Sequence, residues 1–370
     1  MKSSENRREF IKKMGLGSLA LPVFSSIPFS EKPPKYEGKK IGIALVGLGY
    51  YATKQILPAI DASPYWQLTG IVTGTPSKIP EFKEKYNLKD ENILNYENYD
   101  KLKNCSDIDV VYVCLPNGMH AEYAIKAAKA GKHVITEKPM ANSVAECEAM
   151  IKACKDSNVK LAVGYRCHFE PFNKEAMRFG REKTFGEINY INSMFGWRAG
   201  NPNMWRLDGK LAGGGPLMDV GIYSINAARY VKAMEPTSVI AHFGPITRPD
   251  YFDEVEESVS WHMEFPDGTV FTGFTSYNTN VEKLECYGDQ GWFEMGPAFS
   301  YGPLKGKTSK GPMDLPVVHH QTYQMNGMGP MFLSKDPLPD HISGLEGLKD
   351  IKIMMAIYES AKAGGKKMML

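Results

Sequence analysis

The chain has 370 residues, of which 43% are hydrophobic and 23% are charged, and its formal net charge is +2. This length predicts about two domains, and because the positive surplus lies in the first 30 residues, the rest of the chain is nearly neutral. A nearly neutral body gives no electrostatic reason to expect nucleic acid or an anionic membrane surface as a partner, and beyond residue 30 no stretch reaches the roughly 18 uninterrupted apolar residues that a spanning helix needs.

The N-terminus combines adjacent arginines with a weakly apolar stretch. Arg7 and Arg8 stand shortly before a modestly apolar segment at 14–27. This order resembles a bacterial twin-arginine export signal, which implies that the twin-arginine machinery delivers the folded protein to the periplasm. We expect residues 1–30 to be this signal and residues 31–39 to be a linker, with no membrane anchor after processing. The alternative is that the segment is a basic amphipathic helix of the mature fold.

A strand and a glycine-rich turn open the body of the chain. Residues 40–46 are almost continuously apolar, as expected of a strand buried on both faces, and lead into a G-x-G-x-x-A motif. Gly47 permits a tight turn, Gly49 lets backbone amides approach a pyrophosphate, and Ala52 lets the following helix pack close to the strand. The motif predicts a dinucleotide site. The cofactor-binding residues expected here are Gly47, Gly49, Tyr50, Tyr51 and Ala52.

The end of the next strand bears on the choice of cofactor. The strand at 67–72 is followed by Thr73, Thr75 and Lys78, with no Asp or Glu to hold a ribose 2′-hydroxyl. Small hydroxyl side chains and a lysine would instead accommodate a 2′-phosphate. We therefore expect NADP(H), with NAD(H) as second choice; the alternative is that Lys78 only caps a solvated turn.

Further strands at 109–115, 132–136 and 160–164, with helices at about 121–130 and 144–157, complete a doubly wound Rossmann pattern over residues 40–164. In open α/β sheets, ligands bind at the carboxyl ends of the strands. The residues that fall at these ends are Leu115, Pro116, Asn117, His120, Glu137 and Lys138. His120 either contacts the cofactor ribose or packs beneath the loop.

Strands dominate the second half of the chain, so we expect an α+β domain with a mostly antiparallel open sheet over residues 165–370. Pro266-Asp267-Gly268 is a hairpin signal, and a final helix at about 344–363 is expected to pack back on the first domain. The expected strands are 187–195, 238–243, 257–265, 269–277 and 283–287.

Cysteine and histidine patterns give no sign of a metal. The six cysteines form no CxxC pair and no run with zinc-ligand spacing, so we expect free thiols. His319 and His320 are adjacent, point in different directions and have no carboxylate cluster beside them. We interpret the Gly-, Pro-, Met- and His-rich stretch 301–340 as a loop near the pocket.

Together the motifs resemble the Gfo/Idh/MocA oxidoreductases, most closely the glucose–fructose oxidoreductase branch. The resemblance implies a cis peptide between Lys138 and Pro139 and a homodimer or homotetramer formed through the open face of the second sheet. The segments that carry it are 47–52, 115–120, 137–139, 164–171, 205–206, 213–223, 344–350 and 356–360.

Oxidation of a carbinol requires a base beside the hydroxyl, since the cofactor takes only the hydride. Asp219 and Tyr223 are spaced i and i+4 on a helix expected to begin near Pro216, so they share a face. We assign Tyr223 as proton donor and acceptor, Lys138 as the ammonium that lowers the pKa of the phenol and binds a substrate hydroxyl, and Asp219 as an orienting carboxylate. The family pattern implies the same roles. Further cofactor or substrate contacts are expected from Arg166, Trp205 and Arg206, with surface pairing as the alternative for the arginines.

The sequence thus predicts a periplasmic, NADP-dependent oxidoreductase that acts on an aldose, ketose or glycoside and retains its cofactor. Two related alternatives are a dehydrogenase that makes 3-keto-glycosides and an NAD-dependent glycoside hydrolase that oxidises, eliminates and reduces again. A non-catalytic sugar or cofactor sensor would be expected to lose the lysine or the tyrosine, and both Lys138 and Tyr223 are present.

Overall fold

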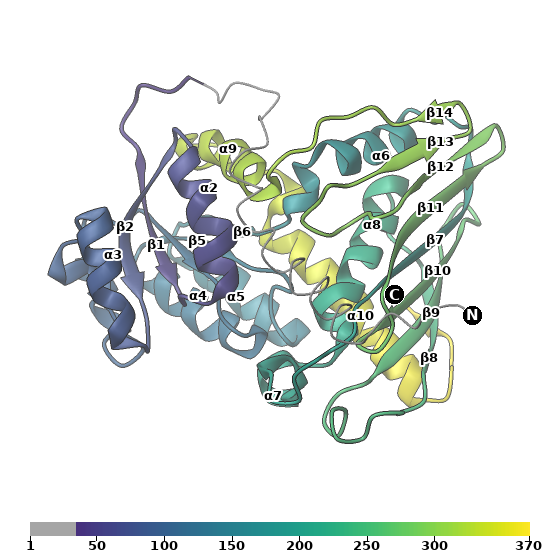
Figure 1. The fold of residues 1–370 in the computed structure, drawn as a ribbon, viewed down its shortest axis with the longest axis horizontal. Coiled ribbons are helices and arrows are strands. Elements are labelled where there is room, and N and C mark those ends of the chain that lie inside the picture. Colours follow the sequence, from purple (N-terminus) through teal and green to yellow (C-terminus); the bar gives the residue numbers. More distant parts are fainter. Residues whose placement is uncertain (1–34) are drawn as a thin grey trace, which may run out of the picture.

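The computed structural model describes residues 35–370, so the expected signal and residues 31–34 of the expected linker lie outside the described residues. The described chain forms two sheets with helices packed on them, the first sheet at the left and the second at the right of Figure 1. The first sheet is parallel and has the order β3-β2-β1-β4-β5-β6, which is the Rossmann order. Its strands are β1 (Ile41–Val46), β2 (Trp66–Val72), β3 (Ile93–Leu94), β4 (Val110–Val113), β5 (His133–Thr136) and β6 (Leu161–Val163).

Helices cover both faces of this sheet. Because side chains alternate along a strand, Ala44 and Val46 of β1 face one helical layer, whereas Ile43 and Leu45 face the other. The first layer holds α4 (His120–Lys129) and α5 (Val144–Asp156). The opposite face is covered by α2 (Leu57–Ala62), by the π-helix η2 (Ala52–Ile56) before it, and by α9 (His320–Leu333) from the far end of the sequence. Beside β2, α3 (Ile79–Tyr86) completes the domain.

The second sheet has nine strands in the order β14-β13-β12-β11-β7-β10-β9-β8-β15 and is antiparallel except where β7 and β10 pair. The expected α/β fold with a mostly antiparallel second sheet is confirmed. The strands are β7 (Ile188–Gly196), β8 (Ser238–Phe243), β9 (Ser258–Glu264), β10 (Val270–Ser276), β11 (Val281–Gly288), β12 (Gly291–Met295), β13 (Gly306–Thr308), β14 (Gly311–Pro312) and β15 (Met368–Met369). The expected hairpin joins β9 to β10, with Gly268 at a φ of 84°.

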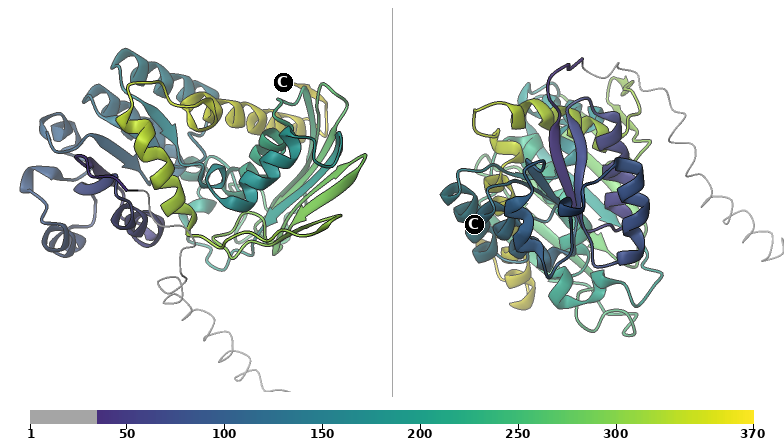
Figure 2. Two further views of the ribbon diagram at one scale, coloured as in Figure 1. Left: turned by 90° about the horizontal axis from the view of Figure 1, so that it is seen from above. Right: turned by 90° about the vertical axis from the view of Figure 1, so that its left-hand side faces the viewer.

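Helices α6 (Pro171–Arg181) and α8 (Ile222–Lys232) lie on one face of the second sheet, whereas the other face carries exposed side chains such as Tyr190 and Tyr287. The final helix α10 (Gly344–Lys362) contacts α5 and β6 in the first domain and α8 and β8 in the second. In the left view of Figure 2 this helix, in yellow, extends between the two halves of the molecule. The expected packing of the final helix on the first domain is therefore confirmed.

The interpretation of residues 301–340 as a loop is wrong, because the stretch contains β13, β14 and α9. Two glycines lower the helix propensity of this segment, so the sequence pattern does not predict the helix α9. A side chain at Gly327 would collide with the ring of Phe169, and one at Gly329 with the ring of Tyr65. Each glycine therefore allows a close helix contact at the cost of helix propensity. The helix is tied to β2 by a hydrogen bond of 2.7 Å from the Trp66 indole to the Met325 carbonyl.

All six cysteines lie in the described part and none forms a disulfide, as expected. Within residues 35–370, no helix is both long and apolar enough to cross a bilayer.

Candidate active site

A cavity of about 540 Å³ lies at the carboxyl ends of the first sheet, where the second domain faces it. Apart from Arg166, every residue expected at the site lines this cavity. Sequence reasoning missed Leu48, Gly74, Tyr96, Cys114 and Tyr301, which line it as well. The structure therefore brings together segments that are up to about 250 residues apart in the chain, as the switch point of a doubly wound sheet requires.

The glycine-rich turn has the geometry that a dinucleotide needs. Gly47 has a φ of 88°, and a side chain there would lie 2.6 Å from the Cys114 carbonyl oxygen. A side chain at Gly49 would instead meet open space. Gly47 therefore makes the tight turn, and Gly49 leaves the backbone bare toward the cavity.

The end of β2 is tied to this turn by a lysine. Lys78 donates a hydrogen bond of 2.6 Å to the Leu48 carbonyl, while the hydroxyl of buried Thr73 accepts one of 3.1 Å from the Thr75 amide. Lys78 thus bonds the glycine-rich turn, and its expected contact with a 2′-phosphate stays a prediction. Two carboxylates line the cavity, those of Glu137 and Asp219. Neither lies at the end of β2, where an Asp or Glu would hold the ribose 2′-hydroxyl of NAD.

His120 packs beneath the loop and also lines the cavity, so its contact with the cofactor ribose stays a prediction. Its Nδ1 lies 2.9 Å from the Pro139 carbonyl and its Nε2 lies 2.9 Å from the Leu115 carbonyl. Burial lowers the pKa of this imidazole. His120 therefore joins the loops after β4 and β5. The expected cis peptide between Lys138 and Pro139 is confirmed.

Asn117 is likewise a structural anchor on this side of the cavity, since its amide donates a hydrogen bond of 2.8 Å to the Ala212 carbonyl. Glu137 is buried and accepts a hydrogen bond of 2.6 Å from the Tyr112 hydroxyl. Burial raises the pKa of the Glu137 carboxyl, against the Tyr112 hydrogen bond and the positive charge of Lys138.

Lys138, Asp219 and Arg206 form a charged cluster in the cavity. The Lys138 ammonium donates a hydrogen bond of 2.6 Å to the Asp219 carbonyl and lies 3.9 Å from its carboxylate. Arg206, which stacks on the Trp205 ring, places its Nε 3.1 Å from the same carboxylate. Burial opposes ionisation of Asp219, but Arg206 and Lys138 outweigh it and hold the pKa of the carboxyl below its ordinary value. For Lys138, burial prevails and lowers the pKa.

Tyr223 lies against this cluster, but the expected effect of Lys138 on its pKa is wrong. The ammonium lies over the ring, 4.5 Å from the centroid. The group at the oxygen is Arg166, whose Nη2 donates a hydrogen bond of 3.1 Å to the hydroxyl. Burial raises the pKa of Tyr223, and the opposing effect of Arg166 is smaller. The phenol therefore remains protonated at neutral pH.

Arg166 does not line the cavity but stands behind Tyr223. It lies at the start of the 3₁₀ turn η7 (Arg166–His168) and is 3% exposed. Its guanidinium also donates to the Phe299 carbonyl and lies 2.8 Å from Nδ1 of His320. Surface pairing is thus excluded for Arg166, and a direct cofactor contact is not what the structure shows.

The segment that carries the two acid–base candidates starts as a π-helix. Residues Leu217–Gly221 form the π-helix η9, and α8 continues from Ile222. The helix expected from near Pro216 is therefore present, with a π-helical start, and Asp219 and Tyr223 both line the cavity. Within the described residues, both π-helices, η2 and η9, contribute side chains to this cavity, and such irregular turns are frequent at functional sites.

Comparison with known proteins agrees with this geometry. The family model described as "Oxidoreductase family, NAD-binding Rossmann fold" matches residues 41–165, and the one described as "GFO/IDH/MocA C-terminal domain" matches residues 174–294. The chain belongs to the Gfo/Idh/MocA oxidoreductase family. As a member of that family, it is an NAD(P)-dependent oxidoreductase.

Among solved structures, the chain is similar to the aldose-aldose oxidoreductase from Caulobacter crescentus complexed with glycerol, with 37% identity, a TM-score of 0.86, and coverage of 90% of this chain and 100% of the other. Among curated proteins, it is 26% identical to D-xylose 1-dehydrogenase [NADP(+)] of Haloarcula marismortui over 87% of this chain and 91% of that protein. A levoglucosan dehydrogenase in complex with NADH and levoglucosan shares the fold at 23% identity and a TM-score of 0.75, covering 90% and 99% of the two chains.

The residues of this Gfo/Idh/MocA chain fit NAD(P). Gly49 has no side chain, and the cavity beside it leaves space for a pyrophosphate that a side chain at this position would occupy. Tyr301, which the sequence did not single out, closes the cavity from the second domain, with its ring centroid 6.1 Å from that of Tyr51. No group of His, Cys, Asp or Glu side chains within residues 35–370 is arranged to hold a metal ion.

Proposed function

We propose that this chain is a periplasmic, NADP-dependent sugar oxidoreductase that transfers hydride between a carbinol of an aldose, ketose or glycoside and a tightly bound cofactor, in the manner of a glucose–fructose oxidoreductase. The observation that carries the proposal is the cluster of Lys138, Asp219 and Tyr223 in the wall of the dinucleotide cavity. The likeness to an aldose-aldose oxidoreductase and to an NADP-dependent xylose dehydrogenase supports a sugar as substrate.

The chain's own residues handle the proton. The nicotinamide, when bound, accepts or gives the hydride. Tyr223 is a phenol at neutral pH, so it is ready to protonate the oxygen of a carbonyl in the reductive direction; in oxidation, Arg166 stabilises the phenolate that must take the proton from the carbinol. Lys138 offers donors to a sugar hydroxyl, and Asp219 keeps Lys138 and Arg206 in place.

A second candidate is oxidation at C3 of a glycoside to give a 3-keto sugar. It is favoured by a curated relative from Saccharopolyspora spinosa, a dTDP-3,4-didehydro-2,6-dideoxy-alpha-D-glucose 3-reductase, which is 27% identical over 71% of this chain. The acid–base cluster serves either reaction, because both interconvert a carbinol and a carbonyl. An NAD-dependent hydrolase would differ by releasing free sugar from aryl glycosides without net cofactor turnover.

The decisive experiment is native mass spectrometry of the protein from the periplasmic fraction of its own host, followed by mixing with pairs of sugars. We expect a retained nicotinamide nucleotide, a dimer or tetramer formed through the open face of the second sheet, and an absorbance change at about 340 nm when one sugar reduces the cofactor and a second reoxidises it. Cytoplasmic protein without nucleotide and without such a change would contradict the proposal.

Replacing Lys78 with alanine should weaken NADP binding about ten- to a hundredfold, because the variant loses the charge-assisted hydrogen bond that we expect Lys78 to donate to the 2′-phosphate. The variant also loses the bond to the Leu48 carbonyl, which would affect NAD and NADP alike. NAD is therefore the internal control: its affinity should change about twofold or less. Titration of both coenzymes, followed by fluorescence, measures the two effects, and equal losses would show that Lys78 only supports the turn.

A further inference from the structure

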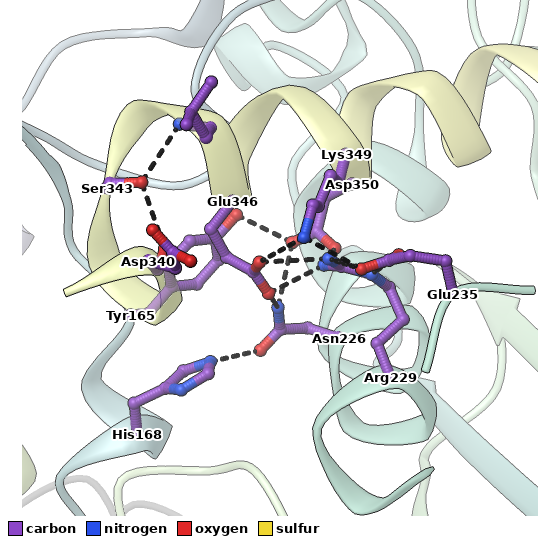
Figure 3. Close-up of polar contacts among 11 residues, drawn as sticks. Tyr165, His168, Asn226, Arg229, Glu235, Asp340, Ser343, Glu346, Lys349 and Asp350 are labelled. Atoms are coloured by element: carbon purple, nitrogen blue, oxygen red, sulfur yellow. Dashed lines mark hydrogen bonds and ion pairs between the residues drawn. The ribbon is translucent and has the colours of Figure 1, made fainter. Parts of the chain in front are cut away.

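The terminal motif at 344–350 is not explained by the cavity, since none of its residues lines it. The motif forms the first two turns of α10. Its acidic side chains, Glu346 and Asp350, point at α8, the helix that carries Tyr223 (Figure 3). Both carboxylates are buried, and Asp350 is fully so.

One buried arginine of α8 gathers these carboxylates. The Arg229 guanidinium lies 2.5 Å from the carboxylate of Asp350 and 2.8 Å from that of Glu346. Its Nε lies 2.6 Å from the carboxylate of Glu235. Burial raises the pKa of the Asp350 carboxyl, and Arg229 counteracts this effect. Such a cluster fixes the position of α10 relative to α8, because each charge would be costly without its partners.

The same Asp350 carboxylate continues the network toward η7. Its Oδ2 accepts a hydrogen bond of 2.7 Å from the Tyr165 hydroxyl and one of 3.1 Å from the Asn226 amide. Asn226 lies on α8 one turn beyond Tyr223. Because its amide nitrogen faces carboxylates, its oxygen is the acceptor for Nε2 of His168, 2.8 Å away (Figure 3). Burial lowers the pKa of His168 to about 3, so the ring is neutral and donates from Nε2.

Tyr165 and His168 thus anchor the two ends of a short segment whose middle holds Arg166. The side chains of Tyr165 and His168 bind the network, whereas Arg166 donates to the Tyr223 hydroxyl at 3.1 Å. Neither Tyr165 nor Asp350 lines the cavity. Any influence that they have on the reaction must therefore pass through Arg166 or through α8.

We propose that the motif at 344–350 is a positioning element of the active site: Asp350, through Tyr165, and Asn226, through His168, hold Arg166 against the oxygen of Tyr223. Tyr165 and Asp350 are positioning residues in this arrangement. The inference rests on the proposed role of Tyr223 as proton donor and acceptor.

Tyr165→Phe tests the inference, because it removes one hydroxyl and keeps the ring. The charged and titratable groups that face Tyr223 are Arg166 and Cys167 of η7, Glu137 and Lys138 after β5, and Tyr51 and Tyr301. Of these, Arg166 lowers the pKa of the phenol most strongly. A displaced Arg166 must therefore move the pH at which oxidation becomes half-maximal upward.

We expect kcat to fall about tenfold, as for a catalytic group displaced by less than about 1 Å, while the KM values for sugar and cofactor stay within about twofold. The pH at which kcat is half-maximal should rise by about one unit. In an Arg166→Lys background, Tyr165→Phe should have no further effect on the pH profile, since the hydrogen bond from Arg166 to the Tyr223 hydroxyl is already lost.

Tyr99→Phe is the matched control. The Tyr99 hydroxyl is also buried and also makes one hydrogen bond, of 3.1 Å to the Tyr123 carbonyl, but it lies in the first domain away from this network. It should lower the melting temperature as much as Tyr165→Phe does and leave the pH profile unchanged. His168→Leu breaks the other anchor, and should shift the profile in the same direction even if Tyr165→Phe does not fold.

The outcomes separate the two proposals. If Tyr223→Phe is inactive while Tyr165→Phe and His168→Leu keep the wild-type pH profile, the positioning role of the motif is overturned and the proposed function stands. If Tyr223→Phe retains the wild-type kcat, the role of Tyr223 as proton donor and acceptor fails and this inference fails with it; the proposed function itself fails only if the wild-type protein shows no sugar-dependent turnover of the cofactor.

Discussion

Tyr223→Phe should reduce kcat in both directions by about 10³-fold, the middle of the range for loss of a positioned acid–base group. The ring that packs against Phe299 and Phe195 remains, so the fold and the cavity should be preserved. Cofactor binding should be unchanged, because the glycine-rich turn and Lys78 are untouched. Stopped-flow reduction of the bound cofactor by an aldose measures the chemical step directly.

The pH profile provides the control for this prediction. In the wild-type protein, oxidation should increase with pH, since the raised pKa of Tyr223 keeps the phenol protonated at neutral pH. The residual activity of Tyr223→Phe should lose this dependence. If the variant instead keeps the wild-type profile with a lower kcat, another group carries the proton, and Lys138 becomes the candidate because burial lowers its pKa.

The first sheet could be predicted from sequence because its strands are short apolar runs buried on both faces. All six strand residues of β1, for example, are buried. The cavity could also be predicted, since parallel strands place their carboxyl ends at one edge of the sheet. The two-residue strand β3, and the strands β12 to β15 toward the two ends of the second sheet, could not be predicted because they are too short or too irregular to show an alternation.

What the sequence could not predict depends on contacts between distant segments. The pKa of Tyr223 is the clearest case: proximity to Lys138 was foreseen, but the balance between burial and charge depends on how deeply the phenol is packed. For the same reason the sequence wrongly predicts that Arg166 contacts the cavity, and it does not single out Tyr301. Both act on the site through neighbours more than 50 residues away, and neither stands in a pattern that fixes the direction of its side chain.

Arg229→Met should destabilise the protein by about 3–5 kcal/mol, the usual effect of removing one partner from a buried ion pair. Methionine fills much of the space, so the loss comes mainly from Asp350, which is left buried without a cation, whereas Glu346 keeps only Lys349 at 3.9 Å. Arg178→Met is the matched control. Arg178 also pairs with two carboxylates, Glu175 and Glu182, but its side chain is 44% exposed where that of Arg229 is 3% exposed, so its loss should cost less than about 1 kcal/mol.

The dependence of this loss on pH distinguishes unpaired carboxylates from a packing defect. Without Arg229, the folded-state pKa of Asp350 rises further above its unfolded value, so the folded state binds more protons than the unfolded state as pH falls through that window. Stability must then decrease as pH rises, and the deficit relative to wild type should be smaller at about pH 5 than at about pH 7.5. Urea unfolding at both pH values measures it. A deficit that is independent of pH would mean that shape rather than charge holds α10 against α8.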